Sequence, residues 1–169
     1  MLHMKALKYI LLLILSYVSV TNFAQNSNSI SLTSRRSSSY DLSAIYTAGK
    51  RPESIVDNSQ WINYSLKVNP SEPLNSISVS IASGTIPPGV EIYLEAESEN
   101  GSGNGKIGRP TGRVKLSSVP QTLINEIGTS STGNGKYRGH RLTMTTVITN
   151  FGLLEPGYYN IYILYTLNQ

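Results

Sequence analysis

Few residues beyond position 24 could carry nucleophilic or acid–base chemistry. His140 is the one histidine there, and the 169-residue chain contains no cysteine, which excludes a cysteine nucleophile and a zinc site built from Cys and His. A serine–histidine–aspartate triad would have to combine His140 with Asp41 or Asp57, and no serine lies in a G-x-S-x-G pattern. We therefore expect His140 to be a loop-edge histidine, we expect no catalytic residue, and we expect that the protein is not an enzyme.

Three carboxylates, Glu91, Glu95 and Glu97, fall on one face of a predicted strand. Glycoside hydrolysis needs two carboxylates that face each other across the substrate. Like charges along one exposed strand are more typical of a solvated edge that discourages stray pairing, and we favour this interpretation. Glu97, Glu99 and Asn100 could offer oxygen ligands to a cation, but the chain has no Asp-x-Asp or Asp-x-Asn cluster of a calcium loop. The sequence predicts no metal site and no cofactor.

Two glycine-rich loops, residues 98–112 and 129–139, share the tetrapeptide Gly-Asn-Gly-Lys. One interpretation is a pair of unrelated turns, because Gly and Asn tolerate positive φ. The other is a pair of related loops that form a binding rim at one end of the fold. The candidate binding residues on this rim are Asn104, Lys106, Asn134 and Lys136. A G-x-G-x-x-G match in the first loop is not a dinucleotide motif, because an apparent strand follows it where a helix is required.

Short runs of alternating apolar and polar residues, separated by turn residues, predict an all-β protein. We expect a single antiparallel immunoglobulin-like β-sandwich of about seven or eight strands. The predicted strands are residues 30–32, 61–68, 77–81, 90–96, 114–116, 142–148 and 157–167. Residues 120–127 could be a further strand or one helical turn, and residues 48–60 read as a loop.

The last predicted strand has one wholly apolar or aromatic face that must be covered, formed by Tyr159, Ile161, Ile163, Tyr165 and Leu167. Its other face, which includes Tyr158, Tyr162 and Leu164, could meet water or a partner.

Alternation places two other aromatic residues, Trp61 and Tyr93, on outward faces of their strands. Exposed aromatic rings can stack on sugars or anchor a protein partner. A one-residue change of face would instead make such a ring part of the core, and for Trp61 we favour this buried alternative.

Residues 1–24 have the layout of a secretory signal peptide: Lys5 and Lys8 precede an apolar run that ends before Ala24. The alternative, a membrane anchor, would need about 20 apolar residues, which is longer than this run. We therefore expect residues 25–169 to form one exported domain, located in the periplasm, at the cell surface or outside the cell, without a membrane span after cleavage.

The charge distribution argues against nucleic-acid binding. Of the 14 basic residues, Lys5 and Lys8 belong to the predicted signal peptide, which leaves 12 basic and 10 acidic residues and a net charge of +2. A nucleic-acid-binding protein is expected to show a concentrated basic stripe, and the remaining basic residues are dispersed.

The export signal, the Ser/Thr/Asn-rich β domain and the terminal Gly-Tyr-Tyr-x-Ile-x-Ile-x-Tyr-Thr-Leu segment resemble secreted pilin-type subunits of fimbriae, including the spore-coat-U-like group. The signal also looks like those of Bacteroidota-type bacteria. The resemblance implies a sandwich that is completed by strand addition from a neighbour. It implies an assembly strand formed by Gly157, Tyr159, Ile161, Ile163, Tyr165 and Leu167. It also implies a donor segment that contains Ile30 and Leu32.

The expected function is that of a non-catalytic structural or adhesive surface subunit, fimbrial-like and acting in cell adhesion, whose partner is a protein. The alternative is a secreted module that binds carbohydrate or another ligand through the glycine loops and the outward aromatic residues.

Overall fold

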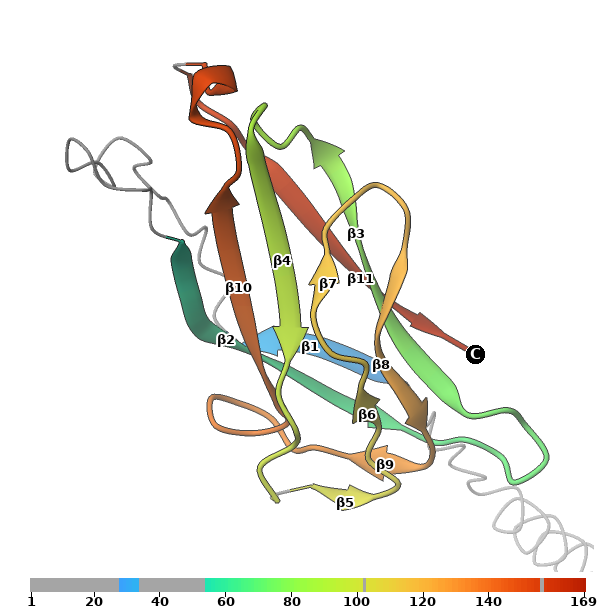
Figure 1. Ribbon diagram of the computed structural model, residues 1–169. Coiled ribbons are helices and arrows are strands. Elements are labelled where there is room, and N and C mark those ends of the chain that lie inside the picture. The colour runs from blue at the N-terminus through green and yellow to red at the C-terminus, as the bar shows by residue number, and fades with distance from the viewer. Residues whose placement is uncertain (1–27, 34–53, 102, 156) are drawn as a thin grey trace, which may run out of the picture.

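The computed structural model describes residues 28–33, 54–101, 103–155 and 157–169, which are almost entirely β-structure (Figure 1). The predicted signal peptide lies outside the described residues. The elements are β1 (Ser29–Thr33), β2 (Ile55–Leu66), β3 (Asn75–Gly84), β4 (Val90–Ala96), β5 (Asn104–Gly105), β6 (Arg109–Pro110), β7 (Val114–Lys115), β8 (Gln121–Ile127), β9 (Ser130–Ser131), β10 (His140–Ile148), the 3-10 helix η2 (Phe151–Leu153) and β11 (Ile161–Asn168).

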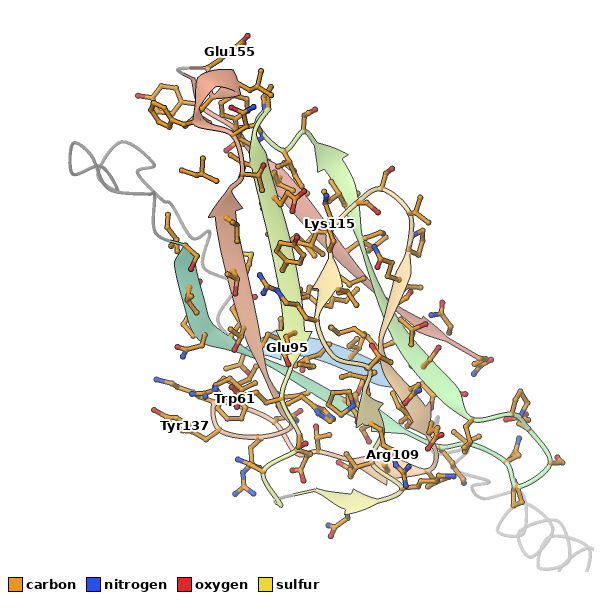
Figure 2. All side chains as sticks on the ribbon, in the orientation of Figure 1. Trp61, Glu95, Arg109, Lys115, Tyr137 and Glu155 are labelled. Atoms are coloured by element: carbon orange, nitrogen blue, oxygen red, sulfur yellow. The ribbon has the colours of Figure 1, made fainter. Side chains whose placement is uncertain are left out.

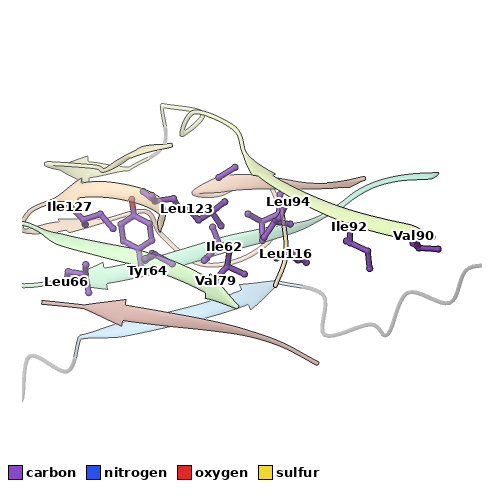
Figure 3. Packing of buried hydrophobic residues seen from close by; sticks show 14 residues of the cluster. Ile62, Tyr64, Leu66, Val79, Val90, Ile92, Leu94, Leu116, Leu123 and Ile127 are labelled. Atoms are coloured by element: carbon purple, nitrogen blue, oxygen red, sulfur yellow. The ribbon is translucent and has the colours of Figure 1, made fainter. Parts of the chain in front are cut away.

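The strands form two antiparallel sheets, which confirms the predicted all-β sandwich. The larger sheet has seven strands in the order β5-β9-β2-β10-β4-β7, with β1 paired to β2. The smaller sheet has the order β11-β3-β8-β6. Strands β7 and β8 are in contact at one side of the sandwich, and β1 and β11 lie on the opposite side, as Figure 3 shows.

The core lies between the two sheets and follows the predicted alternation. On β2, Ile62, Tyr64 and Leu66 point inward and are buried. They meet apolar side chains from β3, β4 and β8, as Figure 3 shows for Val79, Leu94 and Leu123 among others. Residues 120–127, which the sequence left as a strand or a helical turn, contribute β8, because Ile124 and Ile127 pair with Ile77 and Asn75 of β3.

Strand β2 begins earlier than the sequence predicted. Residues 55–60 were expected to be a loop, but Ile55 and Val56 pair with Thr146 and Thr145 of β10. The polar run that follows Val56 hides the strand signal, and pairing with a distant strand overrides it. The rest of the predicted loop, residues 48–53, lies outside the described residues.

Strand β11 begins later than predicted, at Ile161 rather than Gly157. Its alternation is as expected: Ile161, Ile163, Tyr165 and Leu167 are half-buried against the core, whereas Tyr162 and Leu164 are exposed. In the segment before it, the Tyr159 hydroxyl donates a hydrogen bond to the Glu155 carbonyl oxygen at 3.2 Å. Gly157 and Tyr159 precede the strand and do not belong to it.

One buried polar chain connects the two sheets. The Tyr64 hydroxyl lies 2.9 Å from His140 Nε2 and accepts the Gly108 N–H, just before β6, at 3.2 Å. His140 Nδ1 lies 2.8 Å from the Glu97 carbonyl oxygen, which can only accept. Nδ1 therefore carries a proton, and in the neutral ring, which burial favours, Nε2 accepts from the Tyr64 hydroxyl. Burial lowers the pKa of His140 below its usual value near 6.5 and raises the pKa of Tyr64 to about 12.

This chain predicts a pH dependence of stability. The folded state resists protonation of His140, whereas the unfolded chain takes up the proton at about pH 6.5. The contribution of His140 to the free energy of unfolding is therefore complete above that pH and is lost as the pH falls toward the lower pKa of the folded state. Denaturant unfolding at about pH 7.5 and about pH 5.5 measures the loss. A His140→Gln variant is expected to have a lower free energy of unfolding than the unmodified protein at the higher pH. Its free energy of unfolding should then fall less between the two pH values; an equal fall in both proteins would contradict the assignment of the pH dependence to His140.

The same chain predicts the effect of removing one hydroxyl. Tyr64→Phe keeps the ring but leaves His140 Nε2 and the Gly108 N–H without their partner, so we expect the free energy of unfolding to fall by about 1–3 kcal/mol. Tyr158→Phe, which removes a hydroxyl from a fully exposed side chain, is the matched control and should change the free energy of unfolding by less than about 0.5 kcal/mol. Similar losses in both variants would show that the buried chain has no special role.

Candidate functional site

The two glycine-rich loops lie together at one end of the sandwich, where Figure 1 shows β5 and β9. Asn104 and Gly105 pair with Ser131 and Ser130. The Lys106 N–H donates to the Thr129 carbonyl oxygen at 3.0 Å, and the Lys106 carbonyl oxygen accepts from Gly128 at 3.0 Å. All four side chains of the proposed rim are exposed: Asn104, Lys106, Asn134 and Lys136.

The two Gly-Asn-Gly-Lys repeats are not equivalent in structure. Gly105 belongs to β5, and a Cβ there would lie 2.2 Å from the Thr129 carbonyl oxygen. Gly135 lies in an open turn with nothing within 4 Å of such a Cβ. The loops are therefore neighbours, as the rim interpretation requires, but they are not copies of one binding element.

Asn63, a buried residue of β2 with 1% of its surface exposed, holds the second loop in place. Its Oδ1 accepts from the Thr33 hydroxyl at 2.7 Å and from the Gly135 N–H at 3.2 Å. Its Nδ2 donates to the Arg138 carbonyl oxygen at 2.6 Å. One amide thus joins β1, β2 and the turn, and buried amides of this kind are costly to leave unpaired.

The second loop covers the outer face of β2 and so decides the place of Trp61. Trp61 is 8% exposed, which contradicts its prediction as an exposed aromatic and agrees with the buried alternative. Tyr137 packs edge-to-face against it, with ring centroids 5.6 Å apart at 68° (Figure 2). Tyr137 itself is 62% exposed, and the ammonium of Lys136 lies 4.8 Å from its ring centroid.

Tyr93 is half-buried and does not offer a free ring. Its hydroxyl donates to Glu91 Oε2 at 2.5 Å, and the Arg113 guanidinium lies 4.0 Å over the ring. Lys115 Nζ donates to Glu91 Oε1 at 2.6 Å. This bond, together with that from Tyr93, lowers the pKa of Glu91, whereas the general acid of a glycosidase needs a raised pKa.

The other predicted carboxylates are exposed or paired. Glu95 is exposed, and Glu97 Oε1 accepts from Arg141 Nε at 2.9 Å and Nη2 at 2.7 Å. Among the residues that the structure describes, no group of three His, Cys, Asp or Glu side chains could hold a metal ion. His140 is the first residue of β10 and fully buried, so its prediction as a loop-edge residue was wrong.

The predicted assembly strand and donor segment lie on the same side of the sandwich. Ile161, Ile163, Tyr165 and Leu167 of β11 face the core and are only half-buried. Ile30 and Leu32 lie in β1, as predicted, and are also half-buried against that core. Gly157 and Tyr159 are exposed and precede β11.

Sequence reasoning missed two features. The segment from η2 into the first residues of β11 forms a tip at the end opposite the glycine loops (Figures 1 and 2), with the exposed side chains Phe151, Leu153, Tyr158, Tyr159 and Tyr162. The clustering of these five large side chains within 12 positions of the sequence was a signal that could have predicted the exposed tip. Tyr137, in contrast, sits in a glycine-rich loop without periodicity, and its positive φ of 67° could not be read from the sequence.

The second loop predicts different effects for two glycine substitutions. Gly139 and Gly135 both have positive φ, +70° and +105°, which costs any L-residue about 1–2 kcal/mol. A Cβ at Gly139 would also lie 2.2 Å from the Ile62 carbonyl oxygen. We therefore expect Gly139→Ala to lower the free energy of unfolding by at least about 1 kcal/mol more than Gly135→Ala. Equal losses in denaturant unfolding would contradict this close approach of the loop to β2.

Comparison with known proteins adds no family to this geometry. No protein-family model matches the chain, and neither a curated protein nor a solved structure shows significant similarity to it. The described residues contain no helix long and apolar enough to cross a membrane.

Proposed function

We propose that this protein is an exported, non-catalytic structural or adhesive surface subunit, with an immunoglobulin-like sandwich that assembles with neighbours through strand addition. The observation that carries the proposal is the edge strand β11. It pairs with β3 on one side, and on its other side no described strand pairs with it. An unpaired strand edge offers a row of backbone donors and acceptors to another chain.

The side chains of β11 support this proposal. Its inward face is apolar but only half-buried, and its outward face exposes Tyr162 and Leu164. Natural edge strands are commonly protected by charges or proline, whereas β11 contains neither. The strand therefore combines open backbone groups with apolar surface that a further strand would cover.

Strand β1 is suited to be the exchanged element. It has five residues, and its one described pairing is with β2. It lies near the start of the described chain, on the same side of the sandwich as β11. Added to the β11 edge of a neighbour, β1 would be the donor strand, and Ile30 and Leu32 would supply its apolar side chains.

The surface role is supported by the exposed tip. Its five exposed side chains in residues 151–162 accompany one charged residue, Glu155. Exposed clusters of large apolar and aromatic side chains are typical of sites that contact another molecule.

Assembly is tested by the mass of residues 25–169 in solution and on an unboiled detergent gel. We expect a ladder of multimers that collapses to the monomer on boiling, because exchanged strands separate only on unfolding. A single monomeric species over the accessible concentration range would refute strand addition.

A peptide of residues 25–36 tests which strand is exchanged. Added in excess, it is expected to cap the free edge and shift the ladder toward shorter species. The matched control is the same peptide with Ile30→Asp and Leu32→Asp, which keeps the backbone groups and removes the apolar side chains. If both peptides act equally, or neither acts, β1 is not the donor.

A second candidate function is a secreted module that binds carbohydrate or another ligand. The adjacency of the two glycine loops favours it, since it brings the exposed Asn104, Lys106, Asn134 and Lys136 to one end of the sandwich. A glycan array that stays blank at high protein concentration would count against this candidate.

A further inference from the structure

Tyr137 is held at the surface in a backbone conformation that its residue type disfavours. Its φ of 67° lies in the left-handed region, which is rare for a bulky side chain. In the same turn, Gly133, Gly135 and Gly139 also have positive φ, yet position 137 carries an aromatic ring that is 62% exposed. Such strain persists where surrounding contacts enforce it, and it is concentrated at ligand sites.

Contacts from three directions enforce the conformation. Asn100 Nδ2 donates a hydrogen bond to the Tyr137 carbonyl oxygen. The buried Asn63 holds the next residue through the Arg138 carbonyl oxygen at 2.6 Å. Trp61 supports the ring edge-to-face from below the loop. The ring is therefore positioned before any ligand arrives, which reduces the entropy lost on binding.

Two cationic residues flank Tyr137 in the sequence. Lys136 and Arg138 are exposed, and neither forms an ion pair with a carboxylate in the described part of the chain. The Lys136 ammonium, 4.8 Å from the ring centroid, makes a cation–π contact that is weak at an exposed site. It can therefore turn to an anionic group placed beside the ring.

We propose that Tyr137, Lys136 and Arg138 form a binding site for an acidic sugar, such as a uronic acid residue of a glycan. The apolar face of the sugar ring stacks on Tyr137, and its carboxylate accepts hydrogen bonds from Lys136 and Arg138. The proposal rests on the second candidate function and is independent of strand addition. It differs from that candidate in placing the binding residues in the turn of the second loop alone, instead of in both loops.

The surroundings favour a sugar over a nucleic acid. Nucleic-acid binding neutralises several phosphates in a row and stacks successive bases on several rings. Here two cations accompany one exposed ring. A single carboxylate on one sugar ring matches the site in charge and in size.

Affinity electrophoresis of the exported protein through gels that contain polygalacturonate tests the site. The matched control is methyl-esterified polygalacturonate, which keeps the sugar rings and loses the charge. We expect retardation by the acid form and little by the ester. Equal retardation by both, no retardation by either, or tighter binding of a single-stranded oligonucleotide would overturn the proposal.

Variants then assign the binding to this turn. Tyr137→Ala and the double variant Lys136→Gln/Arg138→Gln are each expected to weaken binding about tenfold, whereas Tyr137→Phe should retain it. Val119→Ala, which removes an exposed apolar side chain outside both the loops and the tip, is the control and should bind like the unmodified protein. Unchanged binding in Tyr137→Ala would refute the site. The multimer ladder, measured on the same samples, should be unaffected, so failure of this proposal and failure of strand addition give different results.

Discussion

The structure depends on the polar groups that strand β2 buries at two neighbouring positions. Tyr64 points into the sandwich and completes a hydrogen-bonded chain through His140 and Gly108, and Asn63 points outward and completes another through Thr33, Gly135 and Arg138. Both side chains are almost fully buried, and a buried polar group without a partner costs more than a hydrogen bond gains. Each of these two hydrogen-bonded networks therefore requires a glycine-rich loop, distant in the sequence, to pack against one face of β2. Because the protein has no cysteine and cannot form disulfides, these buried hydrogen bonds hold its loops in place.

This constraint explains why the glycine-rich loops are ordered parts of the fold. The first loop must bring the Gly108 N–H to Tyr64, and the second must bring two backbone groups to Asn63. Such close approach leaves no room for a side chain at Gly108, where a Cβ would lie 2.5 Å from Ile127 Cγ1, nor at Gly139, where the Ile62 carbonyl oxygen is near. Glycine is used here for backbone proximity as much as for positive φ. The exposed residues of these loops are then displayed from a fixed frame, which is the arrangement that binding loops on a rigid scaffold require.

Alternation along the strands predicted the inward face of β2, the inward face of β11 and the all-β class, because these depend on local periodicity and on the need to bury apolar side chains. The failures have a common physical cause. Trp61 is buried by a turn more than 70 residues away in the sequence, and Ile55 and Val56 become strand through pairing with β10. Each is decided by a long-range contact. The left-handed conformation of Tyr137 is of the same kind, since residues 63 and 100 impose it and its own residue type opposes it.

Strand β1 and the loop site are connected through Asn63. Thr33, at the end of β1, donates to the same Oδ1 atom that accepts the Gly135 N–H, so β1 contributes directly to the frame that holds Tyr137. Because a single exposed ring with two cations gives a weak site, repetition along an assembly would raise the effective concentration of sites for a polymeric glycan. The two proposed activities would in that way reinforce each other without any contact between their surfaces.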